Sequence, residues 1–545
     1  MKKPAVKRTR KTRSPKRAGA ARGGAGSAGA QLLEELDPSE LLALLEAMGL
    51  SDDERSATEL LARFLDLCAF DEPDDDELSR IGGALIEALD KVRIDGNGGL
   101  RQARDEREDI LQMIEDAAES DQLQGVAAMS LSRILTEAGW PTPEVLKQAA
   151  VASLEQANFA PASREQLKAS LTSSLAELVE QVDGDAFALQ AQLSSIMAAF
   201  PNETAAELLH VLASEAEGTL ALAFVGFALH PDQKIAEAVL GGLSAISGRS
   251  VDSRLVERLV RMRTWVPEAR RATLDAAVRA LRPKVAAPVM TTADELRKIS
   301  MTVSDGSGGR SLVFATHKGR AHNAFAVLIK TQGVAEVLCM DDIGKAEVDA
   351  LFEQIKSSAA SSDADIAGAQ SMLALALADN LAAGVPPPYE LVRLVERLGL
   401  GPLTPDTTSA VEAAAELFAN LLPLEADAAT LAQAHAAVIG SATAQSWFEA
   451  GETIENLLGP ARTKKQRVDA LMKTYLPGRR TYWAKTCALS ALALRGPATK
   501  KPGPYAYELA LLARDIASDK PIEKLPLMRA IAETTAEAFA YGARR

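Results

Sequence analysis

The sequence has few of the residues from which disulfide frameworks, thiolate metal centres and strand-rich folds are built. Only three cysteines, Cys68, Cys339 and Cys487, occur in 545 residues, and they have no paired spacing. They predict neither a zinc site nor a disulfide framework, so we expect a cytoplasmic location. Aromatic residues make up 4% of the chain. Because strands favour aromatic and β-branched side chains, their scarcity beside abundant alanine and leucine favours packed helices.

Long apolar runs are also missing. No stretch of 18 or more apolar residues occurs, and the charged N-terminus is not followed by the apolar segment of a signal peptide. We therefore expect a soluble protein without membrane association. Hydrophobic residues account for 47% of the chain and charged residues for 25%, as in ordinary globular proteins. The length predicts two to four domains or one extended repeat array.

The sequence shows no motif of a catalytic or metal centre. Of the five histidines, only His317 and His322 are close in sequence, and no Gly-x-Ser-x-Gly nucleophile motif occurs. The glycine-rich run at 305–309 is followed by a predicted strand, whereas a phosphate-binding loop needs a helix there. These patterns predict a protein that is not an enzyme and that has no cofactor and no metal. Catalytic residues that are distant in sequence would escape this search.

A basic arm precedes an acidic body. Residues 1–33 contain ten lysines and arginines and no acidic residue, which leaves 50 basic against 74 acidic residues in the remainder, a net charge of −24. The arm and its Gly/Ala linker have too little apolar surface to fold, so we expect disorder. It is either a flexible tail or a tether for nucleic acid or another polyanion. Its candidate polyanion contacts are Lys7, Arg8, Arg10, Lys11, Arg13, Lys16 and Arg17.

Helical periodicity dominates most of the chain. Apolar residues at spacings of three and four, such as Ile235, Val239 and Leu243, predict amphipathic helices, and short breaks between them predict antiparallel neighbours. Over about 120–285 this rhythm resembles HEAT-type α-solenoids, with an irregular helical bundle as the alternative. The expected domains are the arm at 1–33, a helical-repeat domain at 34–290, a β-meander plus helix at 291–360 and a second helical domain at 361–545.

The period changes to two between residues 299 and 340. The runs ISMTVS, SLVFATH, AFAVLIK and VAEVLCM predict a four-stranded antiparallel meander whose Ile299, Met301 and Val303 face is buried, and a helix follows over about 345–356. The turn DGSGGR, this meander and the later GVPPPYELVRLVERLG resemble, over about 295–400, a group of bacterial HEAT-repeat-type proteins of undefined role. That resemblance implies an architecture and no activity. The fold class we expect is mainly α with a small inserted sheet.

One basic-aromatic stretch, residues 462–485, stands out near the C-terminus. Such a mixture suits a nucleic-acid or acidic-protein surface, because cations neutralise phosphates and aromatic rings stack on bases. Alternatively, the rings pack inward and the charges solvate one face. Arg479 and Arg480 follow Pro477 and Gly478 at a predicted helix start, where cations are disfavoured unless an anion or carboxylate lies opposite. The candidate contacts for an anionic partner are Arg462, Lys464, Lys465, Arg467, Lys473, Arg479, Arg480, Trp483 and Lys485.

Two functions fit these patterns. The first is a non-enzymatic scaffold or adaptor that binds a protein partner through its helical-repeat surface, which requires no reactive group. The second is a nucleic-acid-associated protein that uses the basic arm and the 462–485 stretch. Salt separates them, because phosphate contacts weaken steeply as salt rises and apolar docking does not.

Overall fold

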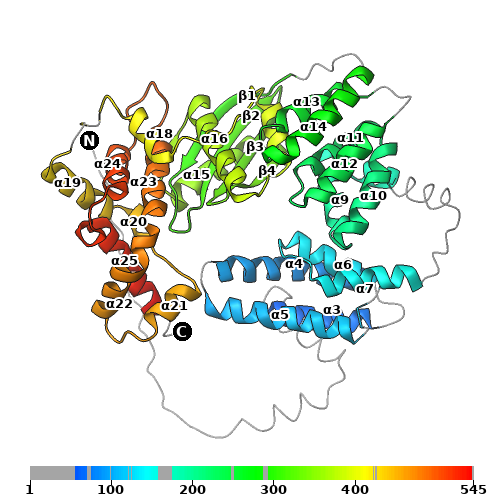
Figure 1. Ribbon diagram of the computed structural model, residues 1–545, viewed down its shortest axis with the longest axis horizontal. Coiled ribbons are helices and arrows are strands. Elements are labelled where there is room, and N and C mark those ends of the chain that lie inside the picture. Colours follow the sequence, from blue (N-terminus) through cyan, green and yellow to red (C-terminus); the bar gives the residue numbers. More distant parts are fainter. Residues whose placement is uncertain are drawn as a thin grey trace, which may run out of the picture. The chain divides into compact units, whose positions relative to one another are not determined.

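Helices form where the apolar spacing predicts them. The face formed by Ile235, Val239 and Leu243 is buried in α12 (Gln233–Ala245), which Asp232 caps by accepting hydrogen bonds from two backbone N–H groups. The computed structural model describes residues 56–69, 75–97, 100–120, 122–123, 125–156, 175–246, 251–285, 292–421, 423 and 426–542 (Figure 1). Apart from Ser56, these residues belong to one unit, Ala57–Arg545. All seven candidate residues of the basic arm lie outside the described residues.

Two groups of helices precede the sheet. The first group packs around a core of its own that includes Leu60, Ile110 and Leu131, and it comprises α3 (Ala57–Cys68), α4 (Asp75–Asn97), α5 (Arg101–Glu119), α6 (Gly125–Glu137) and α7 (Glu144–Gln156). The second group comprises α9 (Ala186–Met197), α10 (Asn202–Glu215), α11 (Gly218–Val225), η2 (Gly226–Leu229), α12, α13 (Ser253–Met262), α14 (Glu268–Leu281) and η3 (Arg282–Lys284). In the second group the most extensive packing is between alternate helices, α10 against α12 and α12 against α14, and not between successive helices as the short connections had predicted.

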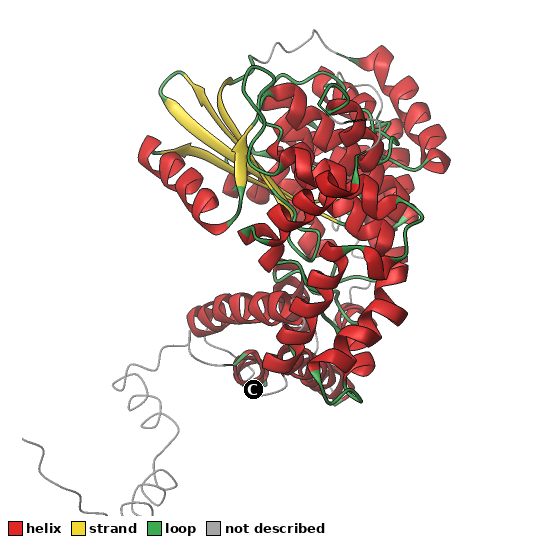
Figure 2. Cartoon of the chain, turned by 90° about the vertical axis from the view of Figure 1, so that its left-hand side faces the viewer, coloured by secondary structure: helices red, strands yellow, loops and turns green. Residues whose placement is uncertain are grey.

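The predicted meander is present as an antiparallel sheet (Figure 2). Its strand order is β4-β3-β2-β1-β5. Its strands are β1 (Glu295–Thr302), β2 (Arg310–Lys318), β3 (Ala321–Lys330), β4 (Gly333–Ile343) and β5 (Ser361–Asp363). The predicted strand count of four was one too low. The fifth strand pairs with β1 through Ser361, Ser362 and Asp363, and three polar residues carry no alternating apolar pattern that could have revealed it.

The two faces of the sheet are covered differently. Ile299, Met301 and Val303 are buried, as predicted, on the face that packs against α16 (Ile366–Ala383) and α23 (Arg480–Leu494). The opposite face carries Val313 and Ala315, which pack against α15 (Lys345–Ser358). Strand register places Phe314 opposite Phe325 on the first face, so the sheet shares one continuous core with the helices around it.

Helices resume after the sheet. They are α16, α17 (Glu390–Arg397), α18 (Ala410–Leu417), α19 (Ala428–Ile439), α20 (Ala442–Gln445), α21 (Glu452–Leu458), α22 (Lys464–Ala470), η4 (Leu471–Tyr475), η5 (Leu476–Arg479), α23, α24 (Ala506–Ala517), η6 (Ile522–Lys524) and α25 (Pro526–Gly542). The fold is therefore mainly α with one small antiparallel sheet, as the sequence predicted. Among the described residues, α16 alone is long and apolar enough to cross a membrane. Its apolar residues Met372, Leu373 and Leu377 lie in the core, which is sufficient reason for its composition.

Candidate functional site

The segment between α16 and α17 is shaped by glycine and proline. Gly384 has φ +69° and ends α16, a left-handed conformation that glycine adopts without a steric penalty. Pro386, Pro387 and Pro388 cannot extend the helix because they lack a backbone N–H group. The next helix begins at Glu390. An extended, stiff segment therefore separates two core helices.

Tyr389 and Arg258 fix this segment to the helices that precede the sheet. The Tyr389 side chain is 3% exposed, and its hydroxyl donates to the carbonyl of Leu222 at 2.7 Å and accepts from Nη1 of Arg258 at 2.8 Å. Nε and Nη2 of Arg258 donate to the carboxylate of Glu396 at 2.8 Å each. Burial raises the pKa of the Tyr389 hydroxyl above its usual range, so this hydroxyl stays protonated as a donor. Every donor here has a partner.

Two half-buried arginines, Arg393 and Arg397, connect the same helix to the sheet and to α9. Arg393 forms an ion pair with Asp185, the N-cap residue of α9, at 2.8 Å, and it also pairs with Asp341 of β4. Arg397 pairs with Asp341 at 2.9 Å and with the fully buried Asp294 at 2.7 Å. Two arginines one turn apart on a helix thus hold three carboxylates from different elements. This network sets the position of Glu390 at the start of the helix.

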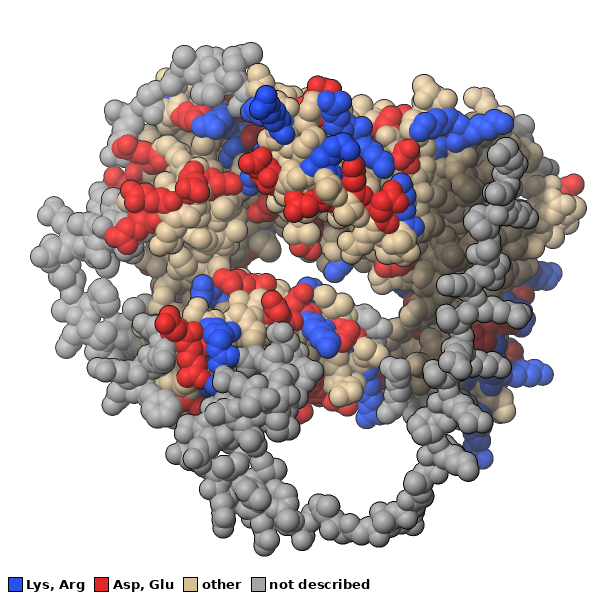
Figure 3. All heavy atoms as spheres, turned by 180° about the vertical axis from the view of Figure 1, so that it is seen from behind, with Lys and Arg blue, Asp and Glu red and all other residues tan. Residues whose placement is uncertain are grey.

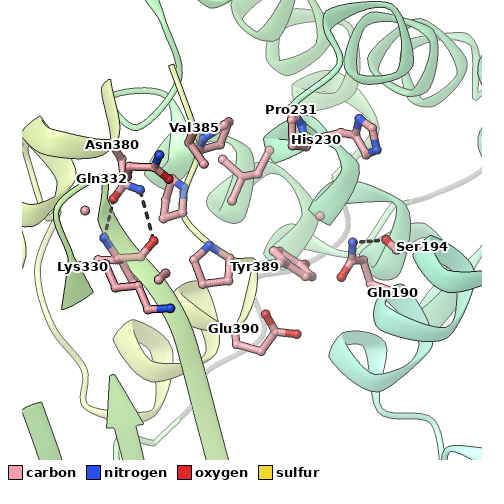
Figure 4. Close-up of a pocket in the computed structure, with 18 residues that line it drawn as sticks. Gln190, Ser194, His230, Pro231, Lys330, Gln332, Asn380, Val385, Tyr389 and Glu390 are labelled. Carbon is pink, nitrogen blue, oxygen red and sulfur yellow. Dashed lines mark hydrogen bonds between the residues drawn. The ribbon is translucent and has the colours of Figure 1, made fainter. Parts of the chain in front are cut away.

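A pocket of about 480 Å³ lies beside the proline segment. Asn380, Gln332 and Lys330 line one side and Gln190 and Ser194 line the other, with the proline segment and Tyr389 between them (Figure 4). The remaining lining residues are Gly226, Leu229, His230, Pro231, Gly333, Val334, Ala335, Val385, Pro386, Pro387, Pro388 and Glu390. Its walls are apolar with polar groups at the sides, which is typical of a ligand site.

Asn380 shapes one wall of the pocket and protects the edge strand. Its amide Nδ2 donates to the carbonyl of Val334 at 3.1 Å, and its Oδ1 accepts from the Val334 N–H at 2.9 Å. The side chain therefore pairs with β4 as a neighbouring strand would. The approach is so close that a Cβ at Gly333, where φ is +105°, would lie 2.4 Å from the Ala376 carbonyl. Only glycine fits there.

Two charged side chains of the pocket have no ion-pair partner among the described residues. Lys330 is exposed at the end of β3, and Glu390 is half-buried at the start of α17. Burial raises the pKa of the Glu390 carboxyl, and the nearby Arg393 lowers it to a smaller extent. One unpaired cation and one unpaired carboxylate thus line the same pocket, and both can contact a ligand.

Most residues of the 462–485 stretch serve the fold of the C-terminal helices. Glu449, a buried residue, accepts hydrogen bonds at 2.8 Å from both Arg479 Nε and the Trp483 indole N–H, and the Tyr475 hydroxyl donates to its other oxygen at 3.3 Å. A carboxylate does lie opposite Arg479, and it belongs to the protein. Arg480 donates instead to the carbonyls of Ile516, Ser518 and Lys520 at the C-terminal end of α24, where a cation is favourable.

Six other cations of the stretch are divided between internal contacts and solvent. Lys464 pairs with Glu537, Lys485 pairs with Asp379, and Arg467 donates to the Ala461 carbonyl at 3.2 Å. Arg462, Lys465 and Lys473 are exposed without a side-chain partner among the described residues. Trp483 is fully buried, so its ring does not face solvent. On the face shown in Figure 3, acidic and basic side chains are interspersed.

The remaining candidate chemistry gives no centre in the described part of the chain. His317 and His322 face each other across the β2–β3 hairpin with ring centroids 6.5 Å apart. No group of three histidine, cysteine or acidic side chains there is arranged to hold a metal ion. Cys487 is fully buried, and burial raises the pKa of its thiol above the usual range, which disfavours the nucleophilic thiolate.

The sequence is similar to proteins whose roles are not described. Residues 201–284 match the family described as Y4lR second domain, and residues 410–540 match the Y4lR C-terminal helical domain. An uncharacterized protein, y4lR, of Sinorhizobium fredii (strain NBRC 101917 / NGR234) is 26% identical over 382 residues, which cover 67% of this chain and 71% of that protein. No solved structure matches. The pocket takes residues both from the first matched region and from the sheet and proline segment between the two.

Proposed function

We propose that the protein is a non-enzymatic interaction scaffold that binds a segment of a partner protein in the pocket beside Pro386–Pro388. The observation that carries this proposal is the pair of charges without an ion-pair partner among the described residues, Lys330 and Glu390, in a pocket of which Asn380, Tyr389 and Gln190 are held by hydrogen bonds. A pocket of about 480 Å³ accommodates a few residues of a peptide.

The chemistry of the lining favours an extended peptide. The proline rings and Val385 offer an apolar wall for side chains, and the exposed amide of Gln332 is suited to the backbone groups of a bound strand. Gln190 donates to Ser194 at 2.8 Å, which orients its amide oxygen as a further acceptor. Glu390 would bind a basic side chain of the partner, which agrees with the acidic body of this chain.

Selection of linear peptides from a displayed library on the full-length chain tests this proposal. We expect the selected peptides to bind at least tenfold more weakly to Glu390→Lys and to share a basic residue. Glu416→Lys, at an exposed position of α18, is the matched control and should bind as the parent does. Peptides that bind both variants equally well would place the binding surface elsewhere.

Association with nucleic acid is a second proposal, supported by a narrower set of residues. Arg462, Lys465 and Lys473 are the cations of the 462–485 stretch that have no internal partner among the described residues, and the basic arm adds to them in sequence. Replacing all three by glutamate should lower the affinity for duplex DNA or RNA. The slope of log affinity against log salt concentration should also become less steep, by the equivalent of up to about three phosphate contacts. Unchanged binding across a salt series would remove these residues from any such role.

A further inference from the structure

Arg310 is a buried arginine at the start of β2. Its side chain lies on the core face of the sheet, opposite Ile329 of β3, and the residue is 3% exposed. The preceding turn is fixed, because the Asp305 carboxylate accepts from the N–H groups of Ser307 at 2.9 Å and Gly309 at 2.8 Å. The Tyr482 hydroxyl also donates to the Gly306 carbonyl at 2.7 Å. Arg310 is therefore held beneath a rigid turn.

The guanidinium of Arg310 has free donors in the interior. Nε and Nη2 are both buried, and neither forms a hydrogen bond with a described residue. Asp379 of α16 is the charge that acts on Arg310, and its Oδ2 is also buried without a partner. Burial lowers the pKa of Arg310 to about 10, and Asp379 opposes that change. A buried cation with unused donors is costly unless something else accepts from them.

The two free atoms lie on one edge of the guanidinium group. That edge presents two parallel N–H bonds and matches the spacing of two oxygens of a carboxylate or phosphate. The chain uses the same edge elsewhere: Nε and Nη2 of Arg263 bind the two oxygens of Asp275 at 2.6 and 2.9 Å. Arg310 presents this edge without a carboxylate of the described chain on it.

The surrounding charges favour an anion. Lys485 of α23 forms an ion pair with Asp379, whereas Arg310 forms none with a described residue, so Arg310, Lys485 and Asp379 together carry a net charge of +1. The Lys485 side chain is 38% exposed, whereas that of Asp379 is 17% exposed. The group thus extends from the interior at Arg310 to solvent at Lys485. Bridging water would satisfy the donors without offsetting this charge.

We propose that Arg310 and Lys485 form a binding site for a small oxyanion, with two of its oxygens on Nε and Nη2 of Arg310. Asp379 holds Lys485 through their ion pair and is not itself a ligand contact. The site uses neither Lys330 nor Glu390, so a test of oxyanion binding is independent of the proposed peptide-binding pocket. Carboxylate and phosphate groups fit it because they offer one oxygen to each donor, whereas chloride offers a single acceptor atom to both.

Calorimetric titration of the full-length chain with inorganic phosphate, sulfate and acetate, in chloride buffer at constant ionic strength, tests this proposal. We expect saturable binding of at least one oxyanion and a concentration-dependent rise in melting temperature. Arg310→Met should weaken binding at least tenfold, and in chloride alone it should melt no lower than the parent because it removes a buried unpaired charge. Arg310→Lys, which keeps the charge without the two-pronged edge, should bind with intermediate affinity.

Two further variants sharpen the result. Asp379→Asn raises the net charge of the group and should tighten oxyanion binding severalfold, whereas Arg320→Met, at an exposed position, should change nothing. Absence of saturable binding to the parent would overturn the proposal whatever the variants do. It would also be overturned if Arg310→Met and the parent bound equally, since an adventitious surface contact would then account for the binding.

Discussion

The helices that begin at Glu390 and at Arg480 both follow a proline-containing segment, but they use their charges in opposite ways. At the start of α23, Arg479 donates to the buried Glu449, and Arg480 donates to carbonyls at the C-terminal end of α24. Both cations therefore have partners within the protein. At Glu390 the arginines further along the helix hold the structure together, and the first carboxylate is left facing a pocket. The unusual composition of the 462–485 stretch therefore marks a structural junction, whereas the ordinary composition around Glu390 borders the pocket that we propose as the binding site.

The largest expected effect comes from the junction at Glu449. Arg479→Glu would place two carboxylates together and leave the buried Glu449 without its cation, so we expect a loss of about 3 kcal/mol in the free energy of unfolding. Lys465→Glu, on the exposed side of the same stretch, should change it by less than about 0.5 kcal/mol. Urea unfolding of both variants measures the difference. Equal stabilities would mean that Arg479 is as solvated as Lys465 and does not stabilise the buried Glu449.

An intermediate effect is expected at Tyr389. Tyr389→Phe keeps the ring but leaves the Leu222 carbonyl and one Arg258 nitrogen without their partner, which should cost about 1–3 kcal/mol. The half-buried Tyr507, which makes no hydrogen bond with a described residue, provides the control Tyr507→Phe. Thermal melts of the two variants compare them. A neutral Tyr389→Phe would show that the proline segment is held by packing alone.

The smallest effect is the contribution of Glu390 to the pH dependence of the free energy of unfolding. Burial raises the pKa of this carboxyl above its ordinary value of 4.5, so the folded state binds a proton more tightly than the unfolded state. The parent should therefore lose stability relative to Glu390→Gln as pH rises from 4.5 through the raised pKa, and the difference should then level off. Urea midpoints from pH 4 to 8 for both proteins measure it. A difference that grows in the opposite direction would mean that the carboxylate has a cationic partner.

The sequence predicted the fold class well where periodicity was strong. Alternation in the segment around Met301 identified both the sheet and its buried face, because each buried side chain contributes to one regular pattern. It missed Ser361–Asp363, whose pairing depends on the neighbouring strand β1 and not on its own composition. This segment therefore forms a strand because it pairs with β1.

The candidate sites could be predicted only in part, because their residues meet through tertiary contacts. Glu449 lies 30 residues from Arg479 and follows no helical period, so nothing local marked it as the carboxylate opposite that arginine. The sequence places Arg310 at the end of the turn DGSGGR, whereas in the structure it begins β2 and lies in the core. The pocket combines Gln190, Lys330 and Glu390 from three distant segments.

The most direct test of the scaffold proposal is site-specific photo-crosslinking in living cells. A photoreactive residue at Gln332, which lines the pocket and is exposed, is compared with the same residue at Glu416 on α18. We expect a discrete protein adduct from position 332 that disappears when Glu390→Lys is added, and no such adduct from position 416. The same adducts from both positions, or an adduct at 332 that survives Glu390→Lys, would contradict it.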